Sequence, residues 1–118
     1  MKVAIVGSRS LQIEIPEAAV PKNTTQIISG AAAGIDTAAR AFALAHRIQV
    51  LELVPDYDRY GRKAPLFRND NIVAMADLVL AFWDGKSRGT KYVIDRCHAT
   101  GTPVKVYRTD EADARTRS

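Results

Sequence analysis

Residues 78–94 read LVLAFWDGKSRGTKYVI, and they carry the clearest signal of the fold class. Its first five residues are all apolar, which is typical of a strand buried on both faces of a parallel sheet. Glycines, hydroxyls and two cations follow, and the pattern from Arg88 onward predicts a helix that Gly101 ends. A strand, a glycine-bearing turn and a helix in this order predict one unit of an α/β protein.

The same order recurs along the rest of the chain. Further apolar runs that predict strands lie at residues 3–6, 26–28, 48–54 and 104–107. Apolar positions at helical spacing predict helices over residues 34–46 and 69–76. Prolines interrupt residues 11–25, so we expect a short helix there at most. This alternation predicts a Rossmann-like three-layer α/β/α sandwich with a mainly parallel five-stranded sheet.

Length and composition limit the class of protein. The 118 residues suit one domain over residues 1–108, followed by a polar tail over 109–118 that we expect to be flexible. A net charge of +4 favours an anionic partner such as a nucleotide or nucleic acid, although a solvated basic surface explains it equally well. Cys97 is the only cysteine, and no apolar run approaches the roughly 20 residues of a membrane span. We therefore expect a cytoplasmic protein that does not contact membranes.

Polar and glycine residues follow three of the predicted strands, at residues 7–9, 29–36 and 83–90. The C-terminal ends of parallel strands meet at one edge of the sheet, where ligands bind. A helix N-terminus there presents unpaired N–H groups, and glycine lets a phosphate approach the backbone. Taken singly, these residues are equally consistent with turns and helix caps. Together they predict a nucleotide or phosphate site.

Individual side chains in these loops suggest roles. Arg9 and Arg88 could clamp phosphate oxygens, and Ser87 and Thr90 add hydroxyl donors. Trp83 offers a face on which a base could stack, or it belongs to the core. His46 and His98 lack the spacing of metal ligands, so the sequence predicts neither a metal nor a cofactor. Cys97 lacks a base at helical spacing, which disfavours a nucleophilic role.

The motifs VAIVGSR (3–9), SGAAAGID (29–36), Arg68-Asn69 and FWDGKSRGT (82–90) resemble the SLOG superfamily. This superfamily includes DprA-like (Smf) proteins and Lonely Guy-like enzymes, and the resemblance is strongest to its short, stand-alone YspA-like branch. The resemblance extends to Tyr107 and implies a Rossmann-like fold that binds nucleotides or their derivatives and forms homo-oligomers.

Residues from these motifs and loops make up the predicted ligand-binding site. They are Gly7, Ser8, Arg9, Ser29, Gly30, Gly34, Asp36, Arg68, Asn69, Trp83, Asp84, Gly85, Ser87, Arg88, Gly89 and Thr90. Lonely Guy-like enzymes carry a catalytic glutamate after the Gly-Thr pair, whereas this chain has Lys91 there. Asp36 is the candidate acid or base that remains for cleavage of an N-glycosidic bond.

Three functions stay open from the sequence. The first is a module that senses or sequesters a nucleotide, and the second is a hydrolase of nucleoside monophosphates or related nucleotides. The third is single-stranded nucleic-acid binding, because residues 54–67 interleave tyrosines and a phenylalanine with arginines and a lysine. The same segment could instead cover a bound nucleotide as a lid, or be an ordinary solvated loop.

Overall fold

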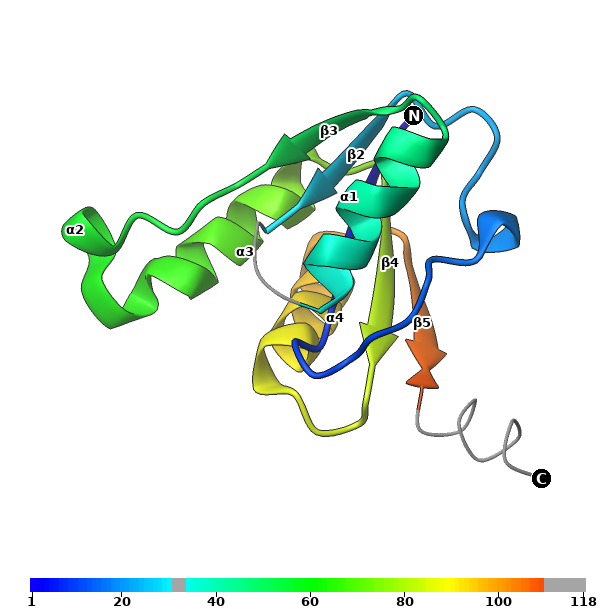
Figure 1. Ribbon diagram of the computed structural model, residues 1–118. Coiled ribbons are helices and arrows are strands. Elements are labelled where there is room, and N and C mark those ends of the chain that lie inside the picture. Colours follow the sequence, from blue (N-terminus) through cyan, green and yellow to red (C-terminus); the bar gives the residue numbers. More distant parts are fainter. Residues whose placement is uncertain (31–33, 110–118) are drawn as a thin grey trace.

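The computed structural model describes residues 1–30 and 34–109. Within that part of the chain, five parallel strands form one sheet in the order β3-β2-β1-β4-β5. The strands are β1 Lys2–Gly7, β2 Gln26–Ser29, β3 Gln49–Glu52, β4 Leu78–Trp83 and β5 Val104–Arg108. The helices are α1 Ile35–Ala45, α2 Tyr57–Tyr60, α3 Ala64–Met75 and α4 Arg88–Thr100, with 3-10 turns at Glu17–Ala19 and Gly61–Lys63. The predicted Rossmann-like α/β fold is thereby confirmed (Figure 1).

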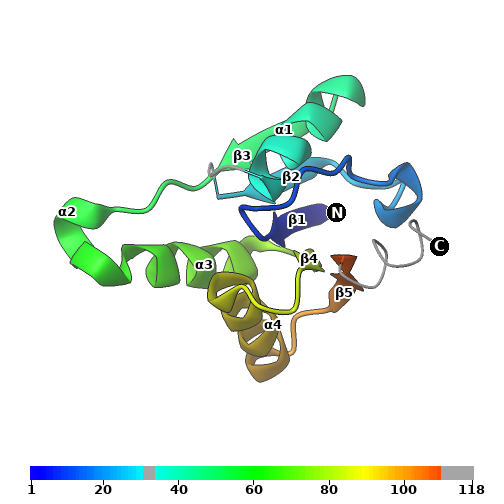
Figure 2. The same ribbon diagram turned by 60° about the horizontal axis from the view of Figure 1, so that its bottom comes forward.

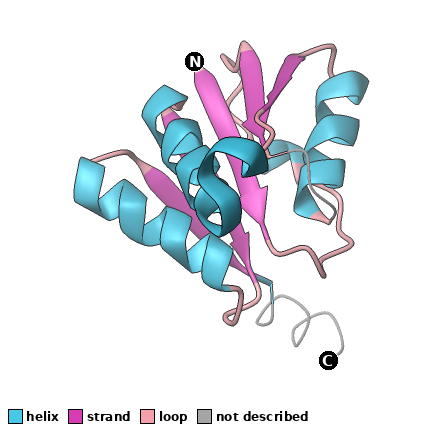
Figure 3. Cartoon of the chain, turned by 90° about the vertical axis from the view of Figure 1, so that its left-hand side faces the viewer, coloured by secondary structure: helices cyan, strands magenta, loops and turns pink. Residues whose placement is uncertain are grey.

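Helices cover both faces of the sheet, as Figures 2 and 3 show. Successive residues of β1 supply both layers, because strand side chains alternate between faces. Val3 and Ile5 pack with the apolar side of α1, whereas Ala4 and Val6 pack with α3 and α4. All four of these side chains are buried, which explains why β1 reads as a continuous apolar run.

The strand order reverses at β1. The chain passes from β1 to β2 on one side of it and later returns to β4 on its other side. Gly7, the last residue of β1, pairs with Phe82 near the end of β4. In an open parallel sheet this switch point leaves a crevice at the carboxyl ends of the strands, where ligands bind.

The segment between β3 and β4 contains more helix than the sequence predicted. The prediction that its helix begins at Asn69 is wrong, because α3 begins at Ala64 and has Pro65 in its first turn. The loop expected over residues 54–67 also contains α2, whose N-cap Asp56 accepts a hydrogen bond from the Arg59 amide at 3.2 Å. Proline is favoured at the first turn of a helix, so Pro65 was a start signal that apolar spacing alone did not reveal.

Two predicted segments, the loop over 29–36 and the tail over 109–118, lie partly outside the described residues. Residues 31–33 of the loop and 110–118 of the tail are not described. Thr109, the first residue of the expected tail, is buried and donates a hydrogen bond to the Trp83 carbonyl oxygen at 3.2 Å. Thr109 is therefore part of the folded domain.

Candidate functional site

A cavity of about 430 Å³ opens where the C-terminal ends of β1 and β4 meet. This cleft is formed by the loop after β1, the first turns of α1 and α4, and one side of α3. Its lining residues are Val6, Gly7, Ser8, Arg9, Ser10, Gly30, Asp36, Pro65, Arg68, Asn69, Ile72, Asp84, Ser87, Gly89, Thr90 and Val93. The cleft therefore lies at the switch point of the sheet, which is the edge that the sequence indicated.

The loop after β1 is held against β4 by its own backbone and side chain. Ser8 is 2% exposed, and its amide donates to the Phe82 carbonyl at 3.2 Å. Its Oγ accepts a longer hydrogen bond, of 3.4 Å, from the Asp84 amide. The two loops that form the cleft are thus joined directly.

The turn from Asp84 to Ser87 presents the N-terminus of α4 to the cleft. One oxygen of Asp84, Oδ1, accepts hydrogen bonds from the amides of Lys86 and Ser87, both at 2.8 Å. Ser87 is the N-cap, and its Oγ accepts from the Thr90 amide at 3.4 Å. An added Cβ at Gly89 would have no atom within 4 Å, so the backbone there is open to a ligand.

Asp84 makes the turn sensitive to acid. Hydrogen bonds from the amides of Ser87 and Lys86, with a smaller contribution from the Ser8 hydroxyl, lower the pKa of Asp84 below its usual 3.8. Asp84 therefore stabilises the fold above about pH 4, and this stabilisation is lost as the pH falls through the lowered value.

We expect Asp84→Asn to reduce the acid sensitivity of the protein. The amide oxygen can still accept from the turn, but it does not titrate in this range. The measurement is the free energy of unfolding by urea at pH 6 and at pH 3. The loss of unfolding free energy from pH 6 to pH 3 should be smaller in Asp84→Asn than in the wild type. An equal loss in both proteins would show that other carboxylates account for the acid sensitivity.

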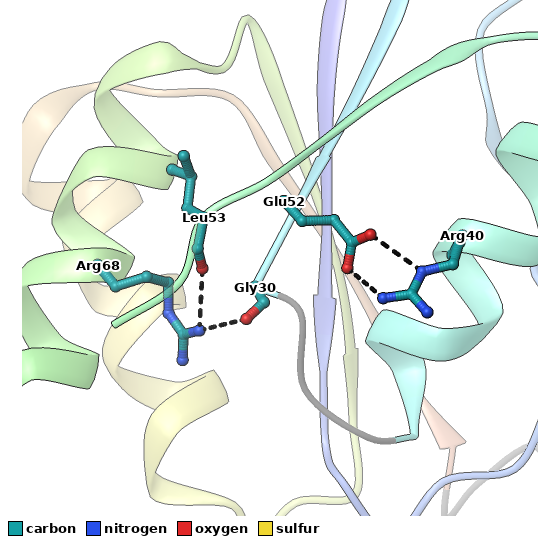
Figure 4. Close-up of polar contacts among 5 residues, drawn as sticks. All are labelled: Gly30, Arg40, Glu52, Leu53 and Arg68. Atoms are coloured by element: carbon teal, nitrogen blue, oxygen red, sulfur yellow. Dashed lines mark hydrogen bonds and ion pairs between the residues drawn. The ribbon is translucent and has the colours of Figure 1, made fainter. Parts of the chain in front are cut away.

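Arg68 lies on the opposite side of the cleft. Its Nη1 donates to the carbonyl oxygens of Gly30 at 2.6 Å and Leu53 at 3.4 Å (Figure 4). Its Nε donates to Asn69 Oδ1 at 2.8 Å. Burial is the largest influence and lowers the pKa of Arg68, while Asp36 acts against this shift. Arg68 thus joins the ends of β2 and β3 to α3 and places a fixed cation in the cleft.

Gly34 fixes how α1 approaches the cleft. It precedes α1 with φ +69°, and an added Cβ would collide with the carbonyl of Arg9. Only glycine combines this positive φ with the absence of a Cβ. Gly34 therefore lets the start of α1 lie against the loop after β1. Asp36, in the first turn of α1, consequently reaches the cleft lining.

Some predicted site residues lie outside the cleft lining. Trp83 packs with the α3 and α4 layer, and Arg88 is exposed. Gly34 lines a different groove, and Gly85 belongs to the turn without lining the cavity. Ser29 is fully buried, and its Oγ has no hydrogen-bond partner within the described part of the chain. The residues that line the cleft therefore overlap with the predicted set without including all of it.

Other residues of the cleft were missed by sequence reasoning. They are Val6, Ser10, Pro65, Ile72 and Val93. Ile72 follows Asn69 by three positions, and Val93 follows Thr90 by three, so each lies on the same helical face as a predicted residue. Helical spacing counted from the polar residues could have identified both.

A second cavity, of about 740 Å³, lies between residues 11–15 and α1. It is larger than the cleft, but its lining is mostly apolar and includes only Gly34 of the predicted site. Small anionic ligands need converging donors, which the cleft provides. The smaller cavity is therefore the better candidate for a site that binds an anion.

Residues 54–67 form an arm that extends away from the sheet, with α2 at its end (Figures 1 and 2). Tyr57, Tyr60 and Phe67 are 55%, 37% and 42% exposed. Tyr60 stacks on Phe67 with ring centroids 4.2 Å apart, and the guanidinium of Arg59 lies 5.3 Å from the Tyr60 ring centre. The arm joins the cleft at Pro65, and Arg68, the residue that follows the arm, also lines the cleft.

Cys97 is fully buried, and burial raises the pKa of its thiol, so the thiolate is disfavoured.

Among residues 1–30 and 34–109, no group of three His, Cys, Asp or Glu side chains is placed to hold a metal ion. No helix in this same part of the chain is long and apolar enough to cross a membrane.

The comparisons with known proteins bear on both fold and family. DNA processing protein A (DprA) from Streptococcus pneumoniae superposes on 89% of this chain with a TM-score of 0.67 at 22% identity, which shows a shared fold. The matched part is about half, 49%, of the solved DprA chain. No model of a known protein family matches the sequence. The Gene 61 protein of Mycobacterium phage D29 is 33% identical in an alignment 84 residues long, which covers 66% of this chain and 67% of that protein. The chain therefore belongs to the same family as the Gene 61 protein of this phage.

Proposed function

We propose that this protein binds a nucleotide or nucleotide derivative in the cleft, with a phosphate group at the N-terminus of α4. The observation that carries this proposal is the open backbone at Gly89, set beside the hydroxyls of Ser8, Ser87 and Thr90 at the switch point of the sheet. The unpaired N–H groups of a helix N-terminus and the positive end of its dipole favour a phosphate there.

The charges in the cleft support an anionic ligand. Arg9 and Arg68 both line it. Burial is the main cause of the lowered pKa of Arg68, Asp36 and Tyr57 act against it, and the smaller repulsion from Arg9 adds to it. An anion that reached both guanidinium groups would accept charged hydrogen bonds from each.

The size of the cleft and the family resemblance support a small nucleotide. Its volume of about 430 Å³ falls within the range of typical small-molecule sites. The resemblance to the SLOG superfamily, and within it to the YspA-like branch, implies nucleotide recognition at this same edge of the sheet. Lys91 stands where Lonely Guy-like enzymes have their glutamate, which favours binding without cleavage.

The first test is a thermal-shift screen of the wild type, Arg9→Ala and Arg88→Ala with nucleoside monophosphates, diphosphates and a short oligothymidylate. A ligand that binds the cleft at about 100 times its Kd should raise the Tm of the wild type by about 5 °C or more. Arg9→Ala should bind this ligand about tenfold more weakly, because it loses a charged hydrogen bond. Arg88→Ala is the matched control, since its side chain is exposed and lies outside the cleft.

Chromatography of the ligands after the screen separates binding from catalysis. Intact ligand supports a sensing or sequestering role, whereas free base would assign N-glycosidic cleavage and make Asp36 the acid or base. Equal binding by Arg9→Ala and the wild type would contradict the proposed site. If only the oligothymidylate binds, and Arg9→Ala does not weaken it, the exposed aromatic and cationic arm becomes the binding surface instead.

A further inference from the structure

Trp83 contacts the turn from Asp84 to Ser87 but is not among the residues that line the cleft. It is the last residue of β4, and its ring packs with the layer formed by α3 and α4. Its Nε1 donates a hydrogen bond to the Ser87 carbonyl oxygen at 3.0 Å. The turn is therefore held both by the Asp84 carboxylate and by the indole.

The acceptor of this hydrogen bond is the residue that orients α4. Ser87 is the N-cap, and its carbonyl also accepts the first helical hydrogen bond, from the Lys91 amide at 3.2 Å. The indole therefore shares an acceptor with the first turn of the helix. A rotation of the Ser87 peptide that broke its hydrogen bond with the indole would also change the direction of the first turn of α4, which carries Gly89 and Thr90.

Trp83 is itself fixed by the edge of the sheet. It pairs with Arg108 of β5, whose guanidinium carbon lies 5.1 Å from the centre of the indole ring. The Thr109 hydroxyl donates to the Trp83 carbonyl at 3.2 Å. The indole is thus held by β5 and can act as a rigid support for the turn.

We propose that Trp83 is a positioning residue for the anion-binding turn, which aims the first N–H groups of α4 into the cleft through the Ser87 carbonyl. This inference rests on the proposed nucleotide-binding function and adds a residue that touches no ligand. It predicts that removal of the indole N–H weakens binding of the phosphate group and leaves binding of the nucleoside portion unchanged.

The test uses the full chain with Trp83 replaced by β-(3-benzothienyl)alanine, in which sulfur replaces the indole N–H. Trp83 is the only tryptophan, so replacement of tryptophan throughout the protein changes one position. Calorimetry then compares AMP and adenosine, and hydrogen exchange follows the amides of residues 88–91. We expect AMP to bind roughly fivefold more weakly, in line with the loss of one hydrogen bond, and adenosine to bind as it does to the wild type. The amides of the first turn of α4 should exchange faster.

The outcomes separate this inference from the proposed function. Unchanged AMP affinity, or equal weakening of AMP and adenosine, would overturn the positioning role while nucleotide binding stood. Unchanged amide exchange in the first turn of α4 would overturn it even without any ligand. If the wild type binds neither inorganic phosphate nor any nucleotide of the thermal-shift screen, the proposed function fails together with the inference. A purely structural role predicts a lower Tm with no change in relative ligand affinity.

Discussion

Replacement of Gly7 by alanine is expected to lower the free energy of unfolding by about 2–3 kcal/mol. A Cβ at this position would lie 2.5 Å from Ile35 Cγ1 and 2.6 Å from the Phe82 carbonyl oxygen. Neither neighbour can move easily, because Ile35 is fully buried and the Phe82 carbonyl accepts the Ser8 amide hydrogen bond. The methyl group would have to separate β1 from α1 or from β4. Urea denaturation followed by circular dichroism measures the loss.

Gly89→Ala is the matched control for this prediction. No atom lies within 4 Å of an added Cβ, and the residue is in the first turn of α4. Alanine also favours helix over glycine by up to about 1 kcal/mol, so stability should be unchanged or slightly higher. The added methyl would instead stand at the open backbone of the cleft and weaken nucleotide binding. If Gly7→Ala were as stable as the wild type, the close packing at the end of β1 would be more adaptable than these distances indicate.

The sequence predicts the sheet well because each strand is encoded locally. Apolar runs such as residues 3–6 and 78–82 are buried on both faces, and no distant residue is needed to recognise them. The glycine-bearing loops could also be placed at one edge, since parallel strands all end there. The strand order required the structure, because side-chain patterns do not specify which strands are neighbours.

The direction of single side chains was less predictable. Phe82 and Trp83 are adjacent in β4 and therefore point to opposite faces, but the sequence does not say which face is next to the cleft. Arg88 was expected to clamp a phosphate and is instead exposed outside the cleft lining, whereas Arg68 reaches the ends of β2 and β3 across the cleft. The hydrogen bond from Arg68 to Gly30 joins residues 38 positions apart. Local sequence patterns do not reveal such a contact, because it depends on the tertiary structure.

Arg68→Ala is expected to reduce both stability and ligand binding. The carbonyls of Gly30 and Leu53 would lose a charged donor, which costs about 1–3 kcal/mol where they cannot reach water. The cleft would also lose a fixed cation, and nucleotide affinity should fall tenfold or more. Urea denaturation and calorimetry measure the two effects separately.

Two further variants distinguish geometry from charge. Arg68→Lys keeps the positive charge but lacks the fork that spans Gly30, Leu53 and Asn69, so it should restore part of the affinity and little of the stability. Arg40→Ala is the control, because Arg40 pairs with Glu52 at 2.6 Å on the surface beside the same strand ends (Figure 4). Exposed ion pairs contribute little, so Arg40→Ala should leave nucleotide binding intact. If Arg40→Ala and Arg68→Ala weakened binding equally, general loss of positive charge would explain the effect, and Arg68 would have no specific place in the site.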